Sequence, residues 1–368
     1  MHRRRVVVWG AIVVLAVASM GCIGVGAGDA DDGPAAPRRP VVDIPSPTAA
    51  VVATEAPVSE STATPGAMET PLPDPTPAPA SSGATVGWRL EAPSPNDGMQ
   101  FSEVTGMDAT AALLLVADAY GGIYGFDLDG SLALLASPGE IGYVSDVAAG
   151  PDGRLTMADS ALHQVTLFDA EGGLLGAFGA PGRGDGEFGG DGPQALSVSA
   201  SGELFVLDPN LDASGAPVLR VQVFNADGDF LRSFLLDPAW DVRDLDVGPD
   251  ETLFVVGPGG FLGELEPEGG RLIQQLGAEI LASASPQAVA VDDAGTLYVA
   301  TQAPAAVAVL SPLGDLVGWV GEEGVRTGEG WDPGTFLFPW TVAVIPDGGM
   351  VFVGELYPPF VYVTAMER

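Results

Sequence analysis

The chain has 368 residues, 46% of them hydrophobic, and a formal net charge of −35. Because 49 acidic residues face only 14 basic ones, we exclude nucleic acid as a partner, since its phosphates need a basic surface. One cysteine and two histidines argue against a disulfide framework and against zinc or copper sites.

The N-terminal segment has the layout of a secretory signal. Residues 1–22 read "MHRRRVVVWGAIVVLAVASMGC", with arginines first, then an apolar run, then small residues. The end "SMGC" resembles a bacterial lipobox and assigns lipid attachment to Cys22, although Ser19 stands where leucine is usual. Alternatively, the apolar residues 6–27 stay as an uncleaved helical anchor. Both interpretations predict an extracytoplasmic chain anchored to the cell membrane.

A low-complexity segment follows at residues 23–83. It is rich in Pro, Ala, Thr and Ser, as in "STATPGAMETPLPDPTPAPA". Frequent proline blocks helices and sheets and favours extended chain. We therefore predict a disordered tether that separates a folded domain from the membrane.

Residues 84–368 carry a repeat of short strands. Apolar segments that end in a small or acidic residue recur every 41 to 54 residues: "LLLVAD" (113–118), "RLTMAD" (154–159), "ELFVLD" (203–208), "TLFVVG" (252–257), "TLYVAT" (296–301) and "MVFVGE" (350–355). Each follows an alternating strand, and most precede two more strands joined by Asp-Gly or Gly-Gly turns. This period and strand number predict an all-β, six-bladed β-propeller with four-stranded blades.

The sixth unit lacks its fourth strand, and the start of the domain supplies a matching one. "ATVGWRLEA" (84–92) is similar to "GDLVGWVGEE" (314–323), the fourth strand of the fifth unit. We therefore predict that the N-terminal strand completes the last blade and closes the ring. We expect the propeller to be monomeric.

Residues 178–231, "FGAPGRGDGEFGGDGPQALSVSASGELFVLDPN…LRVQVFNADGDFL", resemble the NHL repeat. The resemblance covers residues 84–368 and implies a six-bladed propeller whose sites lie in the tunnel or on the loop face. It is weaker in the fourth unit, where Gly257 replaces the acid that ends the second strand, and Thr301 replaces it in the fifth.

The loop "GAPGRGDGEFGG" (179–190) contains an Arg-Gly-Asp sequence. It occupies the place of a loop between two blades, and it also matches a tripeptide that adhesion receptors bind. Under either interpretation Arg183, Asp185 and Glu187 are candidate ligand-binding residues on the loop face.

Calcium is the metal that this composition leaves open, because it needs only oxygen ligands. Acids recur at the ends of the second strands, which makes Asp118, Asp159, Asp208 and Glu355 candidate ligands. In the alternative interpretation each carboxylate caps its own turn by accepting backbone amide hydrogens.

Aromatic residues gather in the last two long loops. Trp331 and Trp340 lie in the longest inter-blade segment, and Tyr357 lies in the next loop. Such side chains are typical of binding surfaces, but they also pack between blades. Both interpretations stay open.

Together these features predict a membrane-anchored, extracytoplasmic propeller that acts as a non-catalytic binding or scaffold module without a cofactor. Its partner would be a protein, peptide or glycan of the cell envelope. The alternative is a calcium-dependent, lactonase-like hydrolase with its site in the tunnel. The location of the acids, in the tunnel or at the turns, discriminates between the two.

Overall fold

The structure is a computed structural model that describes residues 85–92, 102–324, 334–357 and 360–367. All of them belong to one compact unit, Pro73–Arg368. The predicted signal segment with Cys22, the predicted tether and Trp331 lie outside the described residues. Within those residues, no helix reaches the length and apolarity that a membrane crossing requires.

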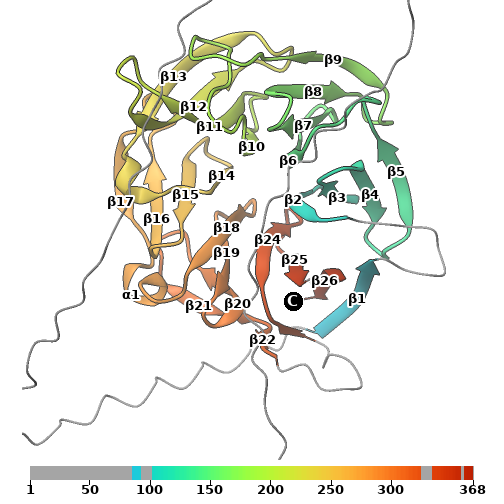
Figure 1. Cartoon of the computed structure of the whole chain (residues 1–368). Coiled ribbons are helices and arrows are strands. Elements are labelled where there is room, and N and C mark those ends of the chain that lie inside the picture. Colours follow the sequence, from blue (N-terminus) through green and yellow to red (C-terminus); the bar gives the residue numbers. More distant parts are fainter. Residues whose placement is uncertain (1–84, 93–101, 325–333, 358–359, 368) are drawn as a thin grey trace, which may run out of the picture. The chain divides into compact units, whose positions relative to one another are not determined.

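The domain is a ring of six four-stranded antiparallel sheets (Figure 1). The first two blades contain β2 (Val104–Ala109), β3 (Leu113–Asp118), β4 (Gly122–Asp127) and β5 (Leu132–Ala136), then β6 (Val144–Ala149), β7 (Leu155–Asp159), β8 (Gln164–Phe168) and β9 (Leu174–Phe178). The third and fourth contain β10 (Ala195–Val198), β11 (Leu204–Leu211), β12 (Pro217–Phe224) and β13 (Phe230–Leu236), then β14 (Asp244–Val247), β15 (Leu253–Gly257), β16 (Phe261–Leu265) and β17 (Leu272–Gln275). The predicted six-bladed propeller is confirmed.

The fifth blade contains β18 (Pro286–Val291), β19 (Leu297–Gln302), β20 (Ala305–Leu310) and β21 (Leu316–Val320). The sixth contains β24 (Pro339–Val344), β25 (Met350–Tyr357), β26 (Phe360–Glu367) and, as its outermost strand, β1 (Thr85–Ala92). Short elements connect the blades: η1 (Pro238–Trp240), α1 (Ala278–Leu281), β22 (Glu322–Glu323) and β23 (Thr335–Phe336).

The ring closes as the sequence predicts, because β1 pairs antiparallel with β26. Trp88 of β1 also fixes the junction with the first blade. Its indole N–H donates to the carbonyl oxygen of Leu128, 2.6 Å away, and its ring lies 5.8 Å from that of Phe352. The first strand of the domain therefore connects its last blade to its first.

The hydrophobic core is divided among the six junctions between neighbouring blades. At the second junction, for example, Val165 of the second blade packs with Phe188, Leu196 and Phe224 from the third. Clusters of the same kind lie at the other five junctions. A single blade cannot bury its own faces, which explains why the second strands read as continuous apolar runs.

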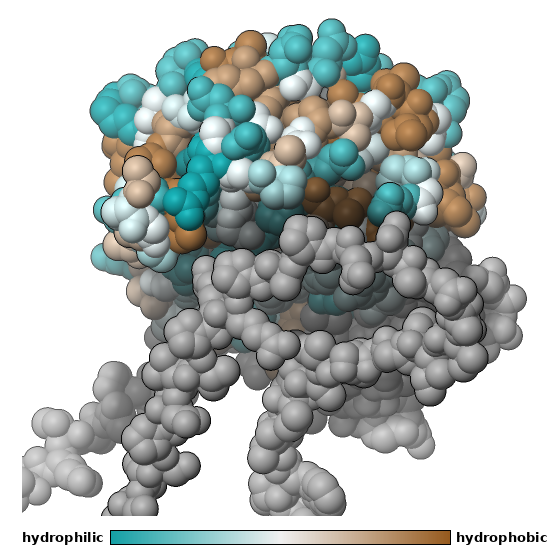
Figure 2. Space-filling view, turned by 45° about the horizontal axis from the view of Figure 1, so that its top comes forward, coloured by the Kyte–Doolittle hydropathy of each residue, from teal (hydrophilic) through white to brown (hydrophobic). Residues whose placement is uncertain are grey.

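The outermost strands expose part of their apolar side chains to solvent. Figure 2 shows hydrophobic residues dispersed among hydrophilic ones over one face of the molecule. The exposed aliphatic residues of the outermost strands are Leu132, Leu135, Leu174, Leu175, Leu231, Leu235, Ile273, Leu316 and Val317. Isolated exposed apolar residues are ordinary on a folded surface.

We predict that deleting Thr85–Ala92 from the full-length protein opens the ring and exposes the sheet edge of β26. A loss of about 5 kcal/mol would lower Tm by roughly 10 °C, measured by thermal unfolding in mild detergent. Deletion of eight residues from the Pro-rich segment, 60–67, is the control and should leave Tm unchanged. Equal Tm values for the two deletions would show that β1 does not hold the ring closed.

Candidate functional site

The acids that end the second strands hold the loops that enter their own blades. Asp159 accepts backbone N–H groups from Gly142 and Tyr143 at 2.7 and 3.0 Å. The equivalent bonds run from Glu103 to Asp118, from Gly189 to Asp208 and from Leu337 to Glu355. Of the four acids, Asp118 and Asp159 also accept a backbone N–H from their own turn, from Tyr120 and Leu162. The described residues contain no group of three or more His, Cys, Asp or Glu side chains placed to hold a metal ion.

The innermost strands of the blades converge around the tunnel. Alternate residues of each one face the next blade in the ring, because side chains alternate along a strand. They form two levels. The loop-side level lies toward the loops that join one blade to the next, and the turn-side level lies toward the turns between first and second strands. The loop-side level contains Gly106, Asp146, Ala195, Asp244, Ala288 and Thr341. The turn-side level contains Asp108, Ala148, Ser197, Asp246, Ala290 and Ala343.

All twelve of these residues are small or are aspartate, because neighbouring inner strands approach closely near the axis. Gly106 shows how little room there is, since a Cβ atom at this position would clash with the carboxylate of Asp146. The sequence therefore places small side chains there to let the strands meet. It places aspartates there for a second reason, which is hydrogen bonding.

The tunnel aspartates bridge the inner strands of neighbouring blades. Asp108 accepts the Ala149 N–H of the second blade at 2.7 Å, and Asp146 accepts the Leu196 N–H of the third at 2.8 Å. Between the third and fourth blades, the Ser197 hydroxyl donates to Asp246, also at 2.7 Å.

The fourth blade makes two such bridges to the fifth. Asp244 accepts the Val289 N–H at 2.9 Å, and Asp246 accepts the Val291 N–H at 2.8 Å. These bonds satisfy amides on the inner edges of the second, third and fifth sheets, where no further strand pairs.

Burial raises the pKa of the tunnel aspartates. It raises the pKa of Asp108 to about 6 and that of Asp246 to about 7, and the charge of Asp108 adds to the second effect. The carboxylates of Asp146 and Asp244 interact electrostatically. Burial raises the pKa of both, and the charge of Asp244 raises that of Asp146 further. The backbone N–H groups oppose these increases because they stabilise the ionised carboxylates.

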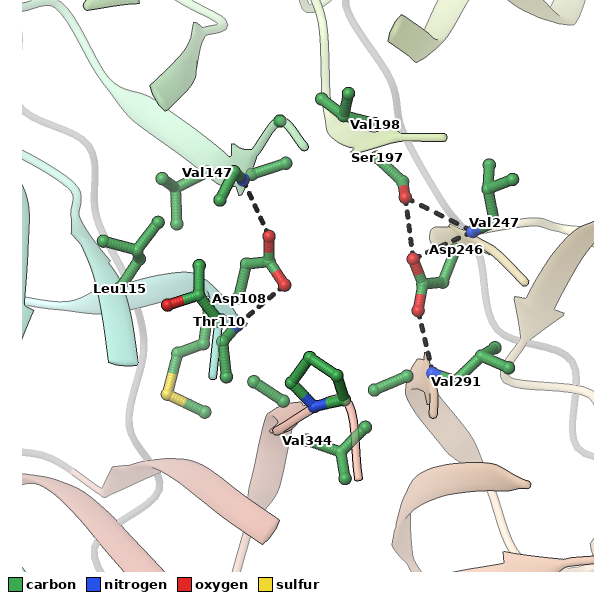
Figure 3. A pocket seen from close by; sticks show the side chains of 18 of the residues that line it. Asp108, Thr110, Leu115, Val147, Ser197, Val198, Asp246, Val247, Val291 and Val344 are labelled. Atoms are coloured by element: carbon green, nitrogen blue, oxygen red, sulfur yellow. Dashed lines mark hydrogen bonds between the residues drawn. The ribbon is translucent and has the colours of Figure 1, made fainter. Parts of the chain in front are cut away.

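A cavity of about 540 Å³ opens on the side of the turns between first and second strands. Figure 3 shows Asp108 and Asp246 on opposite sides of it, with aliphatic residues such as Val198, Val247 and Val291 around them. Among the described residues that line this turn-side cavity, the charged ones are all aspartates. The cavity therefore favours cations and repels anions.

A second cavity, of about 300 Å³, lies at the opposite, loop-side end of the tunnel. The whole loop-side level forms its base. Its remaining lining residues are Thr105, Tyr143, Ser145, Ser160, Gln194, Arg243, Gln287 and Trp340. Unlike the turn-side cavity, this loop-side cavity combines carboxylates with an arginine and two aromatic side chains.

The Arg-Gly-Asp loop joins β9 to β10 and is held from beneath by buried polar groups. The Arg220 guanidinium donates to the carbonyl oxygens of Arg183, Gly184 and Glu187 and forms an ion pair with Asp208, Nε to Oδ2 2.6 Å. The β11–β12 hairpin extends along this loop, where Arg183 donates to the carbonyl oxygen of Asp212. The prediction of an inter-blade loop is confirmed.

The side chains predicted to bind a ligand on this loop differ in their roles. The Glu187 carboxylate accepts the backbone N–H groups of Arg183 and Gly184, so it stabilises the loop itself. Arg183 and Asp185 are exposed to solvent. The adhesion interpretation remains a prediction.

The aromatic residues predicted to bind a ligand differ in where they lie. Trp340 is 38% exposed and lines the loop-side cavity. Tyr357 is the last residue of β25, and its side chain lies outside the described part of the chain. Trp340 is thus the aromatic candidate that the structure brings to the tunnel.

The tunnel aspartates are not among the site residues that the sequence predicts. Asp108, Asp146, Asp244 and Asp246 lie in the first strands, "VTGMDA", "VSDVAA" and "DLDV", whose alternating pattern predicts a strand and no site. An alignment of the first strands on their pairing with the second strands would have revealed small residues and aspartates at two shared positions.

Comparison with known proteins supports the fold alone. No protein-family model matches the chain, and no curated protein matches it. A solved streptogramin B lyase structure is similar, with 13% identity, a TM-score of 0.51 and coverage of 76% of this chain and 98% of that one. A putative gluconolactonase structure shares 15% identity, with a TM-score of 0.54 and coverage of 77% and 93%. The chain thus shares its propeller architecture with both.

The tunnel aspartates predict an unusual dependence of stability on pH. An ordinary aspartate ionises near 3.8, whereas Asp246 ionises near 7 in the folded protein. The folded state therefore binds more protons than the unfolded state between these values, and stability contributed by this group falls as pH rises from about 4 to about 7. We expect Tm to be higher at pH 5.5 than at pH 8, by about 3 °C or more.

Asp246→Asn removes the titrating charge, but its amide keeps only one of the two acceptor oxygens that bond to Ser197, Val247 and Val291. We expect the variant to lose stability at both pH values through the missing acceptor, and to show a smaller difference in Tm between pH 5.5 and pH 8. Asp250→Asn, on an exposed turn, is the control. The raised pKa of Asp246 would be contradicted if the Tm of the natural protein falls steadily below pH 8 and Asp246→Asn shows the same pH dependence.

Arg220→Met tests the support of the Arg-Gly-Asp loop. It leaves buried Asp208 and three carbonyl oxygens without a charged partner, which costs about 3–5 kcal/mol and lowers Tm by roughly 10 °C. Trypsin should also cleave faster after Arg183. Arg271→Met, which removes an exposed pair with Glu266, should cost less than about 1 kcal/mol. Similar losses in the two variants would contradict a supporting role for Arg220.

Proposed function

We propose that this chain is a membrane-anchored, extracytoplasmic β-propeller that acts as a non-catalytic binding module. Its partner is a protein, peptide or glycan of the cell envelope. In this proposal the segment 1–22 exports the chain, Cys22 carries the lipid anchor and residues 23–83 act as the tether. The same proposal assigns the repeat to the NHL type, on the sequence pattern of residues 178–231.

The loop-side cavity is the observation that carries this proposal. It lies over the tunnel, all six inner strands contribute to its base, and Trp340 remains 38% exposed at its side. Its base is rigid because carboxylate bridges join several of the inner strands. A pre-formed cavity with a few fixed polar groups and an exposed aromatic side chain is suited to recognition.

The loop face offers a second contact surface beside this cavity. Arg183 and Asp185 are exposed on a loop whose backbone is fixed by Arg220 and Gln222. A fixed loop loses little conformational entropy on binding, which favours affinity. A larger partner would contact this loop as well as the tunnel mouth.

The enzymatic alternative is a calcium-dependent, lactonase-like hydrolase with its ion held by Asp118, Asp159, Asp208 and Glu355. In the structure each of these carboxylates accepts a backbone N–H from its own loop. Those contacts support a structural role for the four acids and favour the binding module.

The test is the Tm of the full-length protein in mild detergent with a chelator, with calcium and with magnesium. A native-state ion site stabilises the protein by an amount that rises with ion concentration. The binding module predicts equal, small effects of both ions through charge screening. Hydrolysis of simple lactones and esters is measured in parallel.

A Tm increase specific to micromolar calcium, together with calcium-dependent hydrolysis, would overturn the proposed function. Asp159→Asn separates the two accounts further. It keeps an acceptor oxygen for the loop amides, so the binding module predicts a small loss of Tm that is the same with and without calcium.

A further inference from the structure

We propose that the loop-side cavity binds a small zwitterion of the size of a free α-amino acid. Asp146 and Asp244 hold its ammonium group, and Arg243 holds its carboxylate. This inference rests on the proposed binding function and names the ligand class of the same site.

The ammonium half of the site is the carboxylate pair at the base of the cavity. Each carboxylate accepts two backbone N–H groups, one from its own strand and one from the next blade. A carboxylate has about four lone-pair positions, so both can accept further hydrogen bonds. Asp146 is only 8% exposed, and its charge interacts with that of Asp244. A cationic group between the two would relieve this repulsion.

Arg243 supplies the carboxylate half. Its guanidinium donates one hydrogen bond, from Nη1 to Oε1 of Gln287 at 2.9 Å, and both residues line the cavity. In the described part of the chain, no carboxylate pairs with Arg243, in contrast to four other arginines, namely Arg154, Arg220, Arg232 and Arg271. Its remaining N–H groups form a planar fork that matches a ligand carboxylate.

Thr341 adds a neutral polar group to the wall of the cavity. The residue is 6% exposed and lines both tunnel cavities. Its hydroxyl group is not among the buried polar atoms that lack a partner in the described part of the chain, so it is open to the cavity. A hydroxyl group both donates and accepts, so it can bond to either charged end of a zwitterion.

The combination of charges selects the ligand class. Arg243 disfavours a bare cation, and the two aspartates disfavour an anion, because like charges in a confined site repel. A zwitterion satisfies both, and its apolar part can lie beside Trp340. The cavity of about 300 Å³ is at the small end of ligand sites, which suits an amino acid rather than a longer peptide.

The experiment is calorimetric titration of the full-length protein in mild detergent with four probes. L-leucine carries both charges, leucinamide only the positive one, N-acetyl-L-leucine only the negative one, and calcium chloride is the metal probe. We expect L-leucine to bind with a Kd below about 1 mM. Removal of either charge should weaken binding about tenfold or more.

Variants assign the two halves of the site. Arg243→Met should bind leucinamide as tightly as it binds L-leucine, and Asp244→Asn should bind N-acetyl-L-leucine as tightly as L-leucine. Thr341→Val, which keeps the shape of the side chain, should weaken binding of L-leucine severalfold. Arg271→Met, an exposed arginine outside the cavity, is the control and should bind L-leucine like the natural protein.

The inference is overturned if leucinamide binds as well as L-leucine to the natural protein, if calcium alone binds, or if none of the four probes binds. It is also overturned if Arg243→Met binds like the natural protein. Absence of binding by all probes, with no calcium-dependent stability or hydrolysis, would reject the zwitterion and leave the binding module standing. The two proposals therefore fail separately.

Discussion

The structure depends on the close approach of six inner strands at the axis of the ring. Near that axis only small side chains fit between neighbouring strands, as the contact of Gly106 with Asp146 shows. The inner edge of each sheet also has backbone N–H groups without a strand partner. Aspartate meets both requirements, because it is short and accepts two amides at once. The bridges from Asp108, Asp146, Asp244 and Asp246 are the result.

This solution to a packing problem also creates the chemistry of the tunnel. Burial of four carboxylates in one channel raises their pKa values and makes the channel attractive to positive charge. At the turn-side end the charged lining among the described residues is entirely acidic, whereas the loop-side end adds Arg243 and Trp340. The two ends of one tunnel therefore favour different ligands, although the same inner strands build both.

The fold was predictable because its signals are local and repeated. The period of 41 to 54 residues, the Asp-Gly turns and the match of 84–92 with 314–323 specified the blades and the closing strand. The tunnel was not predictable in the same way. Asp118 and Asp159 could be found in the sequence because they repeat at strand ends. Asp108 and Asp246 belong to different blades, and only the closed ring places them in one cavity, on its opposite sides. Their proximity depends on strand register and on closure.

The measurement that tests this account most directly is a carboxylate titration by nuclear magnetic resonance, with ¹³C-labelled aspartate in the full-length protein. Asp→Asn variants assign the signals of Asp108 and Asp246. We expect the pKa of Asp108 to be about 6 and that of Asp246 to be about 7, above the ordinary value of 3.8. Titration of both near pH 4 would show that these carboxylates are solvated, and it would contradict the burial of the aspartate bridges that line the tunnel.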